Sequence, residues 1–107
     1  MPLLPCPYIG ADVELTEERE QHIAARHPDL IPEHRELISG TLADPDRVRH
    51  STRFSGARLF SRWYNGLAGG KYVVVVVVSD AVHDRHWIVT AYIARSLAHG
   101  GVEWQRS

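Results

Sequence analysis

The sequence is poor in several features on which particular classes of protein depend. It holds one cysteine, Cys6, so a disulfide framework within the chain is excluded and the core must come from packing alone. Its longest apolar run, from Tyr72 to Val78, is far shorter than the ~20 residues of a membrane helix. Interrupting prolines and the lack of a basic start are not typical of a signal peptide. We therefore expect a single cytoplasmic domain over residues 1–107 with no membrane attachment.

Lysine is nearly absent, and the charges are unevenly distributed. The net charge of −1 excludes a uniformly basic nucleic-acid-binding protein. Residues 1–46 contain three Arg and ten Asp or Glu, a net charge of −7, whereas residues 47–107 contain eight Arg, one Lys and three acids, a net charge of +6. A GC-rich genome explains the preference for Arg over Lys but not this segregation. The basic half can place a strong local field on one surface.

Local patterns predict an α+β fold. Thr16 followed by Glu17 and Glu18 is typical of a helix start, and Pro28 ends that helix near His27. A second helix is expected to start near Pro32 and to end at Asp44. Strands are expected within residues 8–15 and over 47–52, 58–64, 71–79, 87–93 and 102–104. This order predicts two N-terminal helices packed on a mostly antiparallel meander sheet.

Two strands carry the strongest patterns. Residues 71–79 include six consecutive valines, which predicts a central strand that is buried on both faces. In residues 87–93, alternation places Ile88, Thr90 and Tyr92 on one face, and Trp87, Val89, Ala91 and Ile93 on the core face. Two hydroxyl groups are therefore expected side by side on one face of this strand.

Seven histidines provide candidates for proton transfer near neutral pH. His27 lies where the first helix ends, and there the helix dipole favours an imidazolium. A plain C-cap role is the structural alternative for this residue. His22 and His27 are ~140° apart around the helix, so they are poorly placed to share a metal ion. No cysteine cluster or HExxH pattern supports a metal site, and we expect no metal or other cofactor.

A row of basic and aromatic residues follows one parity of residues 58–64, namely Arg58, Phe60, Arg62 and Tyr64. If this row lies across the sheet from Thr90 and Tyr92, guanidinium groups and aromatic rings would meet around a phosphodiester. The alternative is an ordinary solvated sheet face, because Tyr and Thr are good strand formers.

Several short motifs together resemble a known family. They are Leu15-Thr16-Glu17-Glu18-Arg19 with His22-Ile23, then Arg26-His27-Pro28, then Gly70-Lys71-Tyr72 before the valines, and Val89-Thr90-Ala91-Tyr92. In order and spacing they resemble the phage-associated branch of the Barnase–EndoU–colicin–RelE (BECR) nuclease superfamily, over about residues 13–104. The resemblance implies an α+β, RelE-like fold and a metal-independent ribonuclease, toxin or mobile-element effector. It also implies an active surface on the sheet, fringed by the helix that carries the histidine.

The resemblance also implies roles for individual residues. His27 matches the helix histidine as general base or acid, Thr90 and Tyr92 match a polar pair on the late strand, and Arg62 matches a basic residue on the preceding hairpin. We expect these four residues to be catalytic. Lys71 would assist Arg62 in stabilising charge, and Arg58 and Tyr64 would bind substrate. RNA is then the expected partner, and its 2′-hydroxyl group supplies the nucleophile.

Two other functions stay open at this point. One is a non-catalytic module of the same fold that binds RNA or protein, such as a toxin–antitoxin component whose acidic helical layer docks an antitoxin or immunity protein. The other is a structural protein that forms a homodimer through exposed tryptophan. RNA cleavage without metal distinguishes the ribonuclease from both.

Overall fold

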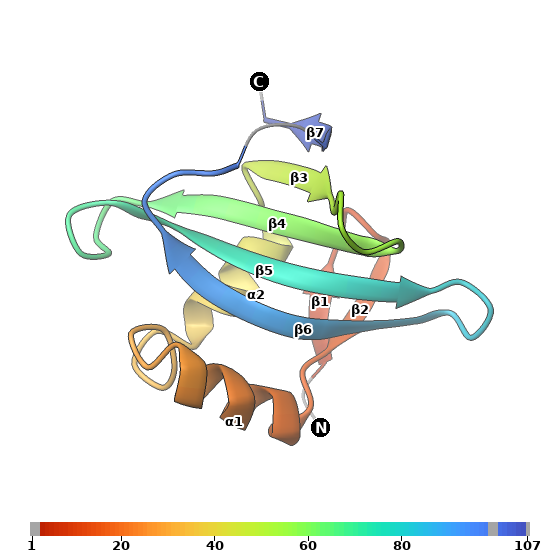
Figure 1. Cartoon of the computed structure of the whole chain (residues 1–107), viewed down its shortest axis with the longest axis horizontal. Coiled ribbons are helices and arrows are strands. Elements are labelled where there is room, and N and C mark those ends of the chain that lie inside the picture. Colours follow the sequence, from red (N-terminus) through yellow and green to blue (C-terminus); the bar gives the residue numbers. More distant parts are fainter. Residues whose placement is uncertain (1–2, 99–100, 107) are drawn as a thin grey trace.

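The computed structural model describes residues 3–98 and 101–106. These residues form an α+β fold with two helices and a seven-stranded, mostly antiparallel sheet (Figure 1). The elements in chain order are β1 (Leu3–Cys6), β2 (Ala11–Glu14), α1 (Glu17–Arg26), α2 (Glu36–Ala43), β3 (Arg47–His50), β4 (Ala57–Tyr64), β5 (Lys71–Asp80), β6 (Arg85–Ala94) and β7 (Val102–Gln105). None of the helices in these ranges is long and apolar enough to cross a membrane.

The sheet has the order β1-β2-β6-β5-β4-β3-β7. Strand β5 is fourth of the seven, so the valine-rich run forms the central strand, as the sequence predicts. All neighbouring strands are antiparallel except β2 and β6, which pair in parallel at Glu14 and Trp87. The Arg85 side chain donates to the Glu14 carboxylate at 2.8 Å near this junction, and the guanidinium lowers the pKa of Glu14.

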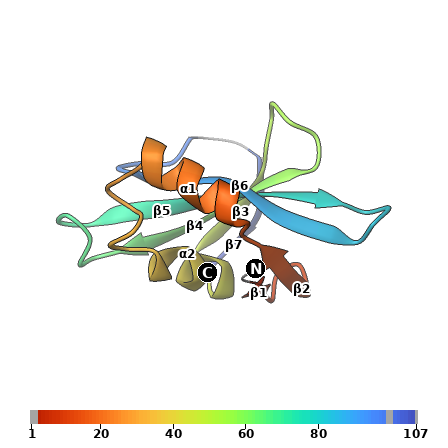
Figure 2. The same ribbon diagram turned by 90° about the horizontal axis from the view of Figure 1, so that it is seen from below.

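The hydrophobic core lies on one side of the central strands. Val73, Val75 and Val77 of β5 are buried in one cluster with Ile23 of α1 and Ile38 of α2. We call the side of the sheet that carries Val73, Val75 and Val77 the helix face, and the opposite side the open face. Figure 2 shows α2 on one side of the sheet, whereas the loop between β3 and β4 rises on the other.

Helix α1 begins as the sequence predicts. The side chain of Thr16 accepts a hydrogen bond from the amide of Arg19 at 3.2 Å, which satisfies one of the free donors of the first turn. Glu17, Glu18 and Glu20 lie in that turn, where the helix dipole favours negative charge. His27 is the C-cap residue, and its amide donates to the carbonyl of Ile23 at 2.6 Å.

The expected start of the second helix near Pro32 is wrong. Residues 28–35 form turns, and α2 begins only at Glu36. Leu30 and Ile31 are both buried in the core, so this segment is held by its side chains rather than by a continuous helical ladder. The amide of His34 donates to the carbonyl of Leu30 at 2.8 Å and that of Arg35 to the carbonyl of Pro32 at 3.4 Å, so the segment is a series of turns that leads into α2.

Strand β6 departs from simple alternation. Its register with β5 shifts between Val76, which pairs with Thr90, and Val77, which pairs with Ile88. This irregularity brings Ile88 to the helix face with Ala91, where both are fully buried. The expected assignment of Ile88 to the face of Thr90 is therefore wrong, and Val89 lies on the open face instead of in the core.

Candidate active site

A groove of about 910 Å³ lies on the open face of the sheet. Its floor is apolar, formed by Leu59 of β4, Val74 and Val76 of β5, and Val89 of β6. The loop over residues 51–55 and the segment over residues 96–98 supply the walls. We call this cavity the open-face groove. Its volume is within the ~300–1,000 Å³ that is typical of ligand sites.

The permanently charged side chains around the open-face groove are cationic. Arg49 and Arg53 line it, and among the described residues no Asp or Glu does. Cations against low-dielectric walls concentrate the electrostatic field inside a cleft. The groove is therefore suited to an anionic ligand with an apolar part.

Arg49 is the unusual residue of this site. Its side chain points from β3 to the open face beside Leu59, and only 5% of the residue is exposed. Its Nη1 donates to the carbonyl of Ala98 at 2.8 Å, but the buried Nε has no hydrogen-bond partner among the described residues. Within the described part of the chain, no carboxylate forms an ion pair with it. A buried cation without a partner anion is costly, which is typical of a group that receives its anion from a ligand.

Thr90 and Tyr92 lie together in the open-face groove, as the alternation in β6 predicts for this pair. Thr90 pairs with Val76 and Tyr92 with Val74, and all four residues line the groove. The two hydroxyl-bearing side chains therefore share one surface with Arg49.

His27 lies beside this pair. Its ring centroid is 6.0 Å from that of Tyr92, with 39° between the ring planes. Helix α1 contacts β6, and this contact carries the C-cap residue to the strand that bears Tyr92 (Figure 1). An imidazole at the end of a helix and a phenol on the sheet thus lie next to each other. Tyr92 lines the open-face groove, whereas His27 lies beside Tyr92 and is not among the lining residues.

Arg62 lies on the helix face, away from these residues. It pairs with the core residue Val73, and its Nη1 donates to the carbonyl of Gly40 at 3.3 Å and lies 3.8 Å from the Asp44 carboxylate. The expectation that Arg62 faces Thr90 and Tyr92 is therefore wrong. In β4, the row that contains Arg58, Phe60, Arg62 and Tyr64 faces the core side, because these residues pair with Val77, Val75, Val73 and Lys71.

The three expected substrate-binding residues have partners of their own outside the groove. The Tyr64 hydroxyl lies 3.1 Å from Oγ1 of Thr41 in α2. Arg58 donates to the Glu103 carboxylate at 3.0 Å, and Lys71 donates to the carbonyl of Ala68 at 2.9 Å. None of Arg58, Tyr64 and Lys71 lines the open-face groove in the described structure. Their contacts instead connect β4 with α2 and with β7, and lie within the hairpin between β4 and β5.

Arg49 is a residue of the candidate site that the sequence-based prediction missed. A signal for it exists: Val48 between Arg47 and Arg49 is the one apolar residue of a short strand, so both arginines must face away from the core. Val48 is indeed fully buried, and it pairs with Phe60 on the helix face.

Residues 3–98 and 101–106 contain no group of three His, Cys, Asp or Glu side chains that could hold a metal ion. No family model, curated protein or solved structure matches the chain. The interpretation of the open-face groove rests on its own geometry and charge.

Proposed function

We propose that the protein is a metal-independent ribonuclease of the BECR type, and that RNA binds in the open-face groove. The observation that carries the proposal is the buried guanidinium of Arg49, which has no anionic partner in the described part of the chain and lies in the same groove as Thr90 and Tyr92. A phosphodiester supplies that anion, and arginine matches its oxygens with a planar set of donors. The apolar floor suits the sugar and base beside it.

The reaction uses three residues that line the groove together with His27, whose ring adjoins that of Tyr92. The 2′-hydroxyl oxygen of RNA attacks the adjacent phosphorus, and His27 takes its proton as general base. The bond from phosphorus to the 5′ oxygen breaks, and Tyr92, whose ring adjoins that of His27, delivers a proton to the leaving oxygen. Arg49 stabilises the added charge on the phosphate, and Thr90 donates to a phosphate oxygen. The products are a 2′,3′-cyclic phosphate and a 5′-hydroxyl end.

The proposal predicts that the protein cleaves RNA in excess EDTA. The measurement is an incubation of single-stranded RNA with the purified protein, followed by analysis of the new ends for cyclic phosphate. A His27→Ala protein purified in the same way controls for contaminating nucleases. Activity that strictly needs an added divalent metal would reject this mechanism. Salt-sensitive RNA binding without any cleavage would favour a non-catalytic module instead.

A further inference from the structure

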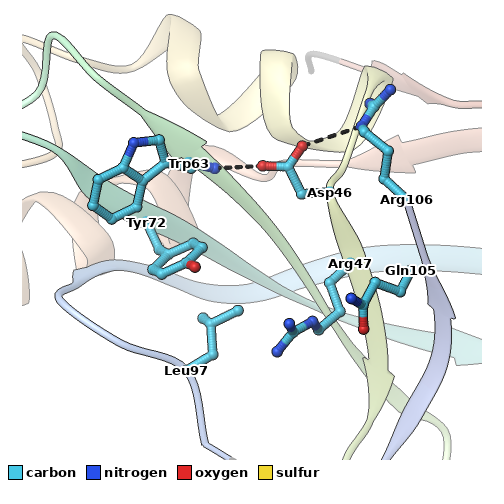
Figure 3. Close-up of a pocket in the computed structure, with 7 residues that line it drawn as sticks. All are labelled: Asp46, Arg47, Trp63, Tyr72, Leu97, Gln105 and Arg106. Atoms are coloured by element: carbon cyan, nitrogen blue, oxygen red, sulfur yellow. Dashed lines mark hydrogen bonds and ion pairs between the residues drawn. The ribbon is translucent and has the colours of Figure 1, made fainter.

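A second, smaller pocket of about 220 Å³ lies beside the open-face groove (Figure 3). Trp63 of β4 and Tyr72 of β5 line it together with Arg47 of β3. Leu97 lines both this pocket and the open-face groove, so the two cavities adjoin across one side chain. We call it the aromatic pocket. Nothing in the reaction proposed above uses it.

The indole of Trp63 is fixed in place although it is 40% exposed. Its Nε1 donates to Asn65 at 2.7 Å, and the edge of Tyr72 packs on it with ring centroids 4.9 Å apart. Gly70 leaves room for the ring, because a Cβ at that position would come within 2.4 Å of the indole. A large aromatic surface held rigid next to a groove loses little entropy when a flat ligand stacks on it.

The charge of the aromatic pocket favours an anionic chain as its ligand. Its acidic residue, Asp46, is already engaged by the backbone amide of Trp63 at 2.8 Å and by Arg106 at 3.2 Å. Arg47 forms no ion pair among the residues that the structure describes. Arg47 and Arg49 are two positions apart on one strand, so their Cα atoms are ~6.6 Å apart along the open face. One extended chain of phosphates can thus meet both.

We propose that the aromatic pocket is a stacking subsite for an unpaired base next to the phosphate held by Arg49, so that the substrate is single-stranded RNA. This proposal rests on the function proposed above. A base stacks on Trp63 only when it is free of a complementary strand, and base–aromatic stacking tolerates all four bases. In duplex RNA the bases are paired and stacked, so they cannot enter the aromatic pocket.

The test is the affinity for a fluorescently labelled 2′-O-methyl RNA oligonucleotide, which lacks the nucleophile and is not cleaved. Trp63→Leu is expected to raise the Kd by roughly 5- to 100-fold, and Trp63→Phe, which keeps an aromatic ring, to recover part of that loss. Trp104→Leu is the matched control: Trp104 is 38% exposed but pairs with Val48 and lies away from both cavities. The Kd of the Trp104→Leu variant for the oligonucleotide should equal that of the wild type.

Two results would overturn the subsite. One is an unchanged Kd in Trp63→Leu, and the other is equal affinity of the wild type for the single strand and for the same sequence in a duplex. Cleavage of RNA in EDTA is measured in parallel. If Trp63→Leu binds the oligonucleotide with the wild-type Kd while the wild type cleaves RNA, the stacking subsite is rejected and the ribonuclease proposal is supported. If Trp63→Leu binds the oligonucleotide weakly while the wild type does not cleave RNA, the ribonuclease proposal is rejected and the stacking subsite is supported.

Discussion

RNA cleavage is expected to fall about 10²–10⁴-fold in His27→Ala, the size of effect typical of a lost general base. The imidazole lies next to Tyr92, which lines the open-face groove, so the substitution removes the group that takes the proton of the 2′-hydroxyl in the proposed reaction. The backbone amide of His27 caps α1 without help from the ring, and the ring is only half-buried, so folding should change little. The measurement is the single-turnover rate at saturating enzyme.

The matched control is His22→Ala. His22 lies on the same helix and is exposed, but it is the ring of His27, not that of His22, that adjoins Tyr92. Its rate should equal that of the wild type, whereas affinity for uncleavable RNA should be nearly normal in both variants. An equal loss of rate in the two variants, or full activity in His27→Ala, would contradict the assigned role.

Arg49→Met should lower the cleavage rate about 10²–10³-fold, because it removes a donor that stabilises charge in the transition state. The same variant should unfold at an unchanged or higher temperature. Methionine has a similar length and buries no charge, and the Nε of Arg49 has no partner to lose. Ala98, which accepts from the arginine, is exposed and can bind water instead. Arg49→Lys should recover only part of the rate, because a lysine lacks the planar set of donors.

The Arg62→Gln variant tests whether the helix face of the sheet contributes to RNA cleavage. This variant loses contacts with Gly40 and Asp44 on the helix face, so it should cleave RNA at nearly the wild-type rate. Thermal unfolding and cleavage rates of the two arginine variants check both expectations. A large loss of activity in Arg62→Gln with normal activity in Arg49→Met would move the site to the helix face. A clear drop in the unfolding temperature of Arg49→Met would instead indicate that Arg49 stabilises the fold.

Much of the fold is predictable because its signals are local. Thr16 caps α1, and the valine run forms the central strand, since each depends on neighbouring residues alone. Strand β1 was not predicted. It contains Pro5, which is compatible with its place at the edge of the sheet but disguises it as a loop. The turns over residues 28–35 depend on the burial of Leu30 and Ile31 against distant elements, which no local pattern reveals.

The candidate site was predictable only in part, for a reason that lies in β5. Six consecutive valines are apolar on both parities, so the sequence does not indicate which set faces the helices. The register with β5 therefore decides the face of every residue in β4, and it places Arg62 opposite Val73 on the helix face. The hydroxyls of Thr90 and Tyr92 keep their shared face because the irregularity in β6 lies before them.

The most direct test of the open-face groove as the RNA site is an NMR titration of the arginine Nε–H groups with uncleavable 2′-O-methyl RNA. If Arg49 binds RNA, the resonance of its buried Nε–H group, which has no hydrogen-bond partner in the described structure, shifts on binding. The resonances of Arg58 and Arg62 on the helix face should stay in place. Movement of Arg58 and Arg62 with an unaltered Arg49 would contradict the account.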